Sequence, residues 1–431
     1  MIPFHLLLTI YVFFHTLSFV KGAPLKFQRR NARWNYETDT IYGVNLGGWL
    51  VLEPYITPSI FEAFGSNDAY IPVDEYHLTK AYGKDQALQV LSNHWETFYT
   101  EDDFAQMKNL GLNMVRIPIG YWAFATLQDD PYVQGQVEYL DKALNWCQKY
   151  GLKAWIDLHG APGSQNGFDN SGLRDQIEWQ NHEYYYTLTY SVLGQIAKKY
   201  SSSDYDDVII GIQLLNEPLG PNLDREKLID FCNNGYDIIR DSGDVPVIIH
   251  DAFFQQDYSW DNILNTNIDP NVWDVILDHH HYQIFSVPEL QRSIDDHVSF
   301  ACNLGKIEGN EYHYAVCGEW TAALTDCAKW LNGVNRGARF DATYQNNTPL
   351  GSCSNLFTAD WSYFQDENVR STYRKYVEAQ MDAYTHNKMN GWIFWCWKTE
   401  NLIEWDFQRL VQLDIIPQPL DSREFYNQCG Y

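Results

Sequence analysis

The sequence is poor in basic residues. Its 431 residues include 30 lysines and arginines against 56 aspartates and glutamates, which gives a formal net charge of -26. Such a field repels nucleic acids and other polyanions, so this class of partner is excluded, and the high charge favours a soluble monomer. Disorder is also excluded, because 45% of the residues are hydrophobic and 16% are aromatic.

The chain also lacks the short motifs of common metal and nucleotide sites. No two cysteines have the CxxC spacing of a zinc or thioredoxin-type site, and no GxGxxG turn follows the first apolar run after the N-terminal leader. Repeats, low-complexity tracts and Pro-rich linkers are missing as well. We therefore expect one domain over residues 31–431, with no cofactor.

Only one long apolar run is present, from Leu6 to Val20. The alternative of a membrane anchor is disfavoured, because a spanning helix needs about 20 apolar residues. Lys21 and the small residues after it complete the layout of a signal peptide over residues 1–22. A short pro-segment over 23–30 then ends in a dibasic pair, so we predict a secreted protein of the extracellular space or cell wall, free of the membrane after processing.

Eight cysteines follow this leader. Those at 147, 232, 317 and 396 lie in apolar periodic segments and are predicted to be buried free thiols. Cys302, Cys327, Cys353 and Cys429 lie in or near polar loops, where an oxidising compartment favours pairing. Four cysteines allow three pairings; we favour 302 with 429 and 327 with 353. Asn346 begins the single glycosylation sequon and is a candidate for modification.

Eight short runs rich in valine and isoleucine recur along the chain. Runs that are apolar on both faces and bounded by turn residues are typical of parallel strands buried on both sides. They cover residues 41–46, 112–117, 152–158, 208–215, 245–250, 273–277, 314–317 and 392–397. Helical patterns lie between most of them, at 101–110, 137–150, 185–200, 225–240, 288–304 and 368–387.

Eight strands that alternate with helices predict an α/β fold, a single (β/α)8 TIM barrel with elaborated loops at the C-terminal face. The alternative is an open doubly wound sheet, which would carry the missing GxGxxG turn. In a barrel the chemistry takes place at the C-terminal ends of the strands. Polar or aromatic residues lie at the ends of seven of the eight runs or just past them: Asn45, Arg116, His159, Asn216 with Glu217, the segment 278–282, Glu319 and the segment 395–398.

Two of these residues are glutamates, Glu217 and Glu319. A single glutamate after a strand can be a helix cap or a surface charge. Two carboxylates that face each other across a barrel mouth instead indicate cleavage of a glycosidic bond, because one must be protonated to release the leaving oxygen and the other ionised to attack. Asn216 precedes the first glutamate and is a ready hydrogen-bond donor.

The strand-end motifs resemble those of one known family, glycoside hydrolase family 5. These motifs are Asn216-Glu217-Pro218, Gly318-Glu319-Trp320, Arg116 and His159. The segments 43–53, 278–285 and 391–398 are similar to those of the secreted fungal exo-β-1,3-glucanases within it. The resemblance covers essentially the whole chain after the leader.

The resemblance implies a role for each catalytic side chain. Glu217 would be the acid/base and Glu319 the nucleophile of a retaining double displacement. Arg116 and Tyr282 would keep Glu319 ionised and oriented, because a cation and a phenol donor favour the charged form. Asn216 would bind the 2-hydroxyl of the sugar, a contact that strengthens in the transition state.

The remaining residues implied by the resemblance would bind the sugar. His159 and His280 would bond glucose hydroxyls. The run 279–281 is all histidine, but neighbouring residues of a strand point to opposite faces, so these three do not converge on one ion and no metal is predicted.

Specificity would depend on one carboxylate and several aromatic side chains. By resemblance, Glu53 would close the cleft into a pocket for a chain end. Trp395 would form the floor under the terminal glucose, with Trp397 as the alternative. Phe168 and Phe285 would gate the second sugar, because aromatic rings pack against the apolar face of a pyranose.

The predicted function is therefore release of glucose from the non-reducing ends of a laminarin-like β-1,3-glucan, with transfer to a sugar hydroxyl as a side reaction. Two alternatives remain. One is another family 5 enzyme, such as an endo-β-1,4-glucanase, a mannanase or a β-1,6-glucanase. The other is a non-catalytic wall protein that binds glucan, which would be expected to have lost one of the two carboxylates.

Overall fold

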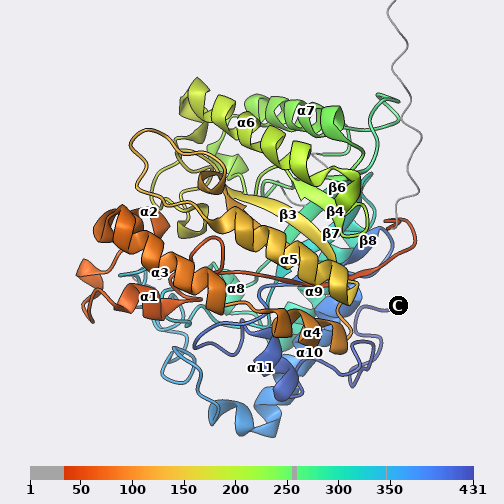
Figure 1. Ribbon diagram of the computed structural model, residues 1–431. Helices are drawn as coiled ribbons and strands as arrows, with labels where there is room; N and C mark the ends of the chain where they lie inside the picture. Colours follow the sequence, from red (N-terminus) through yellow and green to blue (C-terminus); the bar gives the residue numbers. More distant parts are fainter. Residues whose placement is uncertain (1–33, 255–259, 346) are drawn as a thin grey trace, which may run out of the picture. The chain divides into compact units, whose positions relative to one another are not determined.

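The computed structural model describes residues 34–254, 260–345 and 347–431, which contain a closed barrel of eight parallel strands in the order β1 to β8 (Figure 1). The predicted (β/α)8 fold is confirmed. The predicted signal peptide and pro-segment lie outside the described residues, as does Asn346. Among the helices described, none is both long enough and apolar enough to span a membrane.

The strands coincide with the eight predicted runs. They are β1 (Ile41–Asn45), β2 (Met114–Gly120), β3 (Lys153–Gly160), β4 (Ile209–Gln213), β5 (Val247–His250), β6 (Val275–His281), β7 (Tyr314–Trp320) and β8 (Met389–Phe394). The predicted ends of four strands were too early: β2 and β3 continue to Gly120 and Gly160, and β6 and β7 continue through the polar segments that follow their apolar runs. His280 and Glu319 pair in the extension of β6 and β7. β8 instead ends at Phe394, before the predicted end at residue 397.

The helices between the strands include most of those predicted. They are α4 (Glu101–Asn109), α5 (Gln136–Tyr150), α6 (Glu183–Tyr200), α7 (Arg225–Ser242), α8 (Val287–Leu290), α9 (Ile294–Glu308) and α10 (Glu367–Ala383). The single helix expected over 288–304 is wrong. Ser293 and Asp296 form a capping box that begins α9, so the chain forms two helices there.

Other helices were not predicted. The connection from β1 to β2 carries α1 (Pro58–Glu62), α2 (Glu75–Tyr82) and α3 (Lys84–Thr97) before α4, and α11 (Phe407–Gln412) follows β8. In Figure 1 the orange helices α2 and α3 lie at one side of the barrel, next to α5.

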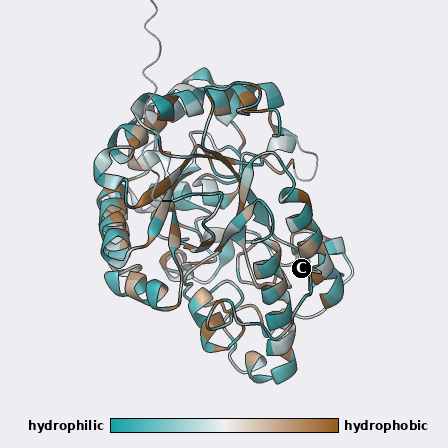
Figure 2. Ribbon diagram, turned by 90° about the vertical axis from the view of Figure 1, so that its right-hand side faces the viewer, coloured by the Kyte–Doolittle hydropathy of each residue, from teal (hydrophilic) through white to brown (hydrophobic). Residues whose placement is uncertain are grey.

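The barrel interior has an apolar layer below a polar one. Each strand contributes one residue to the apolar layer: Ile41, Met114, Trp155, Ile210, Ile248, Ile276, Val316 and Ile393, together with Tyr36. A second, larger core fills the space between the strands and the surrounding helices. Figure 2 shows largely hydrophobic strands inside a ring of helices with hydrophilic faces. Farther along the strands the interior becomes polar, and this polar layer holds the candidate site.

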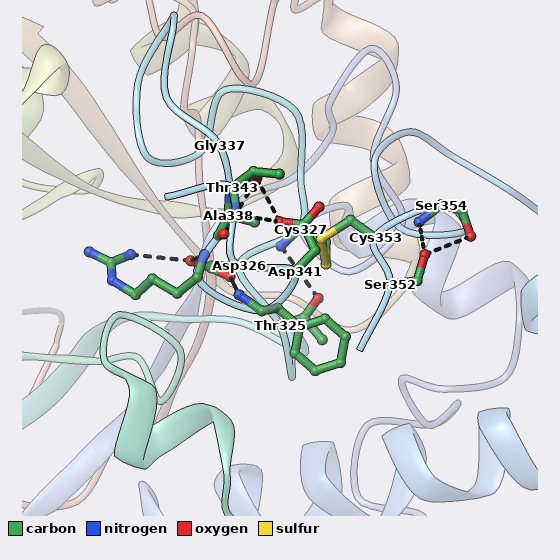
Figure 3. The surroundings of a disulfide bond; sticks show 12 residues. Thr325, Asp326, Cys327, Gly337, Ala338, Asp341, Thr343, Ser352, Cys353 and Ser354 are labelled. Atoms are coloured by element: carbon green, nitrogen blue, oxygen red, sulfur yellow. Dashed lines mark hydrogen bonds and ion pairs between the residues drawn. A yellow bond between two sulfur atoms is a disulfide. The ribbon is translucent and has the colours of Figure 1, made fainter. Parts of the chain in front are cut away.

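Both favoured disulfides are present. Cys302 in α9 bonds Cys429 near the C-terminus, and Cys327 bonds Cys353 within the β7–α10 connection. Figure 3 shows the second bond beside Asp326, whose carboxylate accepts hydrogen bonds from the backbone N–H groups of residues 339 and 340. The other four cysteines are free and buried, as predicted.

Removal of the 302–429 disulfide is expected to lower the free energy of unfolding by about 3–5 kcal/mol, because the bond closes a long loop and restricts the unfolded chain. The variant Cys302→Ser/Cys429→Ser tests this by denaturant unfolding. Cys232→Ala is the control, since it removes a buried thiol that closes no loop. Equal losses in the two variants would contradict the expectation.

Candidate active site

Arg116 lies at the centre of the polar layer. Its side chain is fully buried in β2, and the guanidinium donates to Glu319 Oε1 at 2.8 Å and to Asn216 Oδ1 at 2.6 Å. Further bonds reach Asn45 of β1 and Gln213 of β4, and an ion pair reaches Asp157 of β3. One cation thus connects side chains from β1, β3, β4 and β7, which orients the residues that face the barrel mouth.

Glu319 is held at both oxygens. Arg116 donates to Oε1, and the Tyr282 hydroxyl donates to Oε2 at 2.8 Å. These are the two contacts that the sequence predicted. Burial raises the pKa of Glu319 and the nearby Glu217 adds to this effect, while His280 and Arg116 oppose it; the net pKa shift is upward.

Glu217 is bonded to an imidazole. His280 Nδ1 lies 2.8 Å from Glu217 Oε1, and Asn170 donates to Oε2 at 3.1 Å. Burial favours the neutral carboxyl, but the bond to His280 and its charge outweigh this effect and lower the pKa of Glu217 to about 2. Burial likewise disfavours charge on His280, yet Glu319 and Asp278 raise its pKa to about 10. In this arrangement the proton rests on the imidazole.

The same imidazole nitrogen fixes the spacing of the two carboxylates. His280 Nδ1 is 2.8 Å from Glu217 Oε1 and 3.4 Å from Glu319 Oε2. Two carboxylates in contact with one nitrogen favour the close pair of a retaining glycosidase, about 5–5.5 Å apart, over the separation of about 6.5–9.5 Å that an inverting glycosidase needs for its water. The geometry therefore suits direct attack by one carboxylate.

The three consecutive histidines point to alternate faces, as expected for a strand. His280 lies between Glu217 and Asp278, whereas His279 and His281 are directed to the other side of β6, toward Glu308 of α9. Both nitrogens of His280 thus already face carboxylates. A bond from His280 to a glucose hydroxyl, as predicted, requires that one of these contacts is given up.

Two of the predicted sugar-binding residues have a buried polar atom without a hydrogen-bond partner among the described residues. One is Asn216 Nδ2, a donor, whose own carbonyl oxygen accepts from Arg116. The other is His159 Nε2, which is an acceptor in the neutral ring because Nδ1, 2.6 Å from Asp157, carries the proton. An unpaired buried polar atom is costly unless a ligand satisfies it. Both atoms are therefore free for the sugar contacts that the sequence predicted.

Of the two candidate floor tryptophans, only Trp395 lies with the site. Its ring stacks on His159 with a centroid distance of 5.7 Å, and its N–H donates to the Tyr55 hydroxyl. Trp397 instead donates to Asp103 of α4 and stacks on Phe407. The alternative assignment to Trp397 is corrected: β8 ends at Phe394, so the alternation that would align residues 395 and 397 stops there.

Glu53 is a buried carboxyl, 3% exposed. Burial, followed by the charges of Asp169, Glu319 and Glu217, raises its pKa well above the usual range. Phe168 and Phe285, by contrast, are 39% and 41% exposed, which is expected of residues at a cleft entrance.

The sequence did not predict several contacts of the site. Asn170 bonds Glu217, Tyr55 bonds Trp395, and Asp169 acts on Glu53 through its charge. Asn170 and Asp169 lie in the β3–α6 connection, where no periodic pattern marks them. Asp157 and Asp278 could have been found, since each lies two residues before a predicted histidine on the same strand.

Gly318 leaves no space for a side chain. A Cβ atom there would lie 1.9 Å from Asp278 Oδ1, and the Gly318 carbonyl accepts a bond from Asn45 at 2.8 Å. Gly318→Ala is therefore expected to displace Asp278, which bonds His280, and to lower stability by about 1–3 kcal/mol together with activity. Thermal unfolding and kcat measurements test this.

Gly194→Ala in α6 is the matched control for that prediction. Its Cβ would meet only Ile238, at 3.9 Å, and alanine is favoured over glycine within a helix. We expect unchanged activity and unchanged or higher stability. If Gly318→Ala behaved in the same way, the close approach to Asp278 would not matter.

Fold and site together define a class of protein. The (β/α)8 barrel presents two buried carboxylates at its mouth, close to one imidazole and one guanidinium. This arrangement is typical of the active site of a glycoside hydrolase. The family model for cellulases of glycosyl hydrolase family 5 matches residues 79–401. The chain belongs to this family.

Similar proteins carry consistent names. The chain is 62% identical over 415 residues to a glucan 1,3-beta-glucosidase of Pichia angusta, with 96% of this chain and 94% of that one covered. It is 52% identical to glucan 1,3-beta-glucosidase I/II of Saccharomyces cerevisiae, over 91% of this chain and 88% of the relative. A rutinosidase from Aspergillus niger has a similar fold, with a TM-score of 0.69 at 18% identity over 89% of this chain and 99% of that chain.

Proposed function

We propose that this enzyme is an exo-acting β-1,3-glucosidase that releases glucose from the non-reducing end of β-1,3-glucan with retention of configuration. The observation that carries the retaining mechanism is the position of His280 Nδ1, within 3.4 Å of oxygens of both Glu217 and Glu319. The linkage preference is supported by the names of the relatives, which are more than 50% identical over most of the chain.

In the first step Glu319 attacks the anomeric carbon of the terminal glucose. The bond from this carbon to the leaving oxygen breaks, and that oxygen takes a proton from Glu217. In the second step Glu217 accepts a proton from water, whose oxygen displaces Glu319. Two inversions give net retention. A sugar hydroxyl in place of water would give the transfer product.

His280 supplies the proton that Glu217 needs. In the resting site the proton lies on the imidazole, and the charge of Glu319 is the largest influence that raises the pKa of His280. As Glu319 forms its bond to the sugar it loses this charge, so the attraction that keeps the proton on His280 weakens. The proton then moves along the 2.8 Å contact to Glu217 and on to the leaving oxygen.

Exo action is supported by the residues around the terminal sugar. Glu53 is buried beside the catalytic carboxylates, while Phe168 and Phe285 stand exposed. A pocket closed by Glu53 would admit only a chain end, whereas an endo-acting relative would need an open groove. We also propose that the mature enzyme begins at Asn31 and acts outside the cell as a monomer on an uncharged polymer.

Product analysis on laminarin and cellulose tests this function. The expected result is glucose released singly from laminarin, first detected by NMR as the β-anomer, with little action on cellulose. A mixture of oligosaccharides would contradict exo action, and α-glucose as the first product would contradict retention. Preferential release from cellulose would indicate another activity of the family.

A further inference from the structure

The first turn of α2 contacts three loops at the barrel mouth. Glu75 is the first residue of this helix and is 1% exposed. Its Oε2 accepts the backbone N–H of Leu52 and its Oε1 accepts the indole N–H of Trp122, both at 2.9 Å. Leu52 follows β1 and Trp122 follows β2, so one carboxylate joins the loops after two neighbouring strands.

The residues on either side of Glu75 hold the third loop. The carboxylate of Asp74, which caps α2, accepts the backbone N–H of Arg174 at 2.7 Å. The backbone N–H of Tyr76 donates to the Gly172 carbonyl at 3.0 Å. Residues 172 and 174 belong to the β3–α6 connection, which also carries Phe168 and Asn170.

The Leu52 contact is the important one for the sugar pocket. Leu52 directly precedes Glu53, whose backbone carbonyl accepts the N–H groups of Ile56 and Thr57 at 3.0 and 3.1 Å. Hydrogen bonds therefore hold the peptide group that follows Glu53 and the peptide group one residue before it, which carries the Leu52 N–H. Trp395 and Glu400, which follow β8, also bond residues 55 and 56 of this segment. The bond to Glu75 is the one that connects the segment to α2.

We propose that Glu75 is a positioning residue for the terminal-glucose pocket, which it serves by fixing Glu53 through the Leu52 N–H. This inference rests on the proposed function of Glu53. Glu75 would not contact the sugar itself, because one of its carboxyl oxygens accepts the Leu52 N–H and the other accepts the Trp122 indole N–H.

A glutamine at position 75 can accept only one of the two hydrogen bonds, either from the Leu52 N–H or from the Trp122 indole. The side chain keeps its size but has one acceptor oxygen and one donor NH2 group, so either Leu52 or Trp122 would face a donor instead of an acceptor. Trp122→Phe removes the competing indole N–H. In the double variant the amide oxygen can turn to Leu52, and its NH2 group occupies the place of the lost donor.

The experiment compares Glu75→Gln, Trp122→Phe and the double variant on an aryl β-glucoside and on laminarin. For Glu75→Gln we expect kcat/KM to fall by about 10–100-fold on both substrates, mostly through KM, because the terminal glucose is common to them. The double variant should recover most of this loss. If Glu75 only stabilised the fold, Trp122→Phe would remove a further hydrogen bond and would not restore kcat/KM.

Glu378→Gln is the control. Like Glu75, Glu378 is fully buried and accepts backbone N–H groups, those of Glu424 and Phe425, and it also pairs with Arg374 of the same helix. It should show that loss of such a carboxylate does not by itself change KM. If Glu75→Gln does not fold, Glu75→Asp keeps the carboxyl group but is too short to reach both donors, and it should raise KM in the same way.

Two outcomes separate failure of this inference from failure of the proposed function. The first applies when Glu53→Gln raises KM. The positioning role of Glu75 is then overturned if folded Glu75→Gln or Glu75→Asp has an unchanged KM, or if Trp122→Phe does not rescue Glu75→Gln. If Glu53→Gln itself left both substrates unaffected, the proposed pocket would be wrong, whatever the Glu75 variants do.

Discussion

Glu319→Gln should abolish glucan hydrolysis, with a loss in kcat of about 10⁴-fold or more, because the amide cannot form the glycosyl bond. The fold should persist, since the amide oxygen can still accept from Arg116 and the side chain keeps its size. Activity on laminarin and thermal unfolding measure the two effects. Activity near that of the unchanged enzyme would show that Glu319 is not the nucleophile.

A smaller variant allows the role of Glu319 to be identified from product stereochemistry. Glu319→Ala leaves a space on the face of the sugar that the carboxylate would attack. Added azide can enter this space and displace the leaving group of an activated aryl β-glucoside in one inversion, which gives the α-glucosyl azide. A β-glucosyl azide from this variant would instead assign Glu319 as the acid/base.

Glu217→Ala has the second large expected effect. General acid catalysis contributes about 10²–10⁴-fold, so kcat/KM on laminarin should fall by this factor. An aryl β-glucoside with an acidic leaving group needs no proton and should retain much more of its first-step rate. Comparison of the two substrates separates loss of the acid from loss of binding.

Azide provides the complementary test for Glu217. With Glu319 intact the covalent intermediate still forms, and azide can replace the water that Glu217 would activate. Turnover should rise with azide concentration and the product should be the β-glucosyl azide, after two inversions. An equal loss on both substrates, without rescue by azide, would contradict the acid/base role.

The sequence predicted the barrel because parallel strands buried on both faces leave a simple pattern. The apolar runs marked all eight strands, and the polar residues at their ends or just beyond them included Arg116, Glu217 and Glu319. The errors arose where tertiary contacts decide the structure. Trp397 was the alternative to Trp395 as the floor of the sugar pocket, but beyond the end of β8 it donates to Asp103 of α4 instead. Ser293 divides a pattern that otherwise resembles one helix.

Residues outside the strand ends could not have been assigned in this way. The hydrogen bond from Asn170 to Glu217 joins residues 47 positions apart in the sequence, and so does the bond from Trp122 to Glu75. Neither lies in a pattern that indicates which backbone or side chain it meets. Their partners follow from how the loops fold over the barrel mouth, which depends on packing over the whole face.

The bonds of Arg116 have a consequence for how this enzyme loses activity on heating. No strand among β1, β3, β4 and β7 can separate without leaving part of a buried guanidinium unpaired, which costs several kcal/mol. The backbone amides of these strands should therefore exchange with solvent at similarly slow rates, through one cooperative opening. Heat inactivation should coincide with global unfolding, so residual activity would measure the fraction of molecules that remain folded.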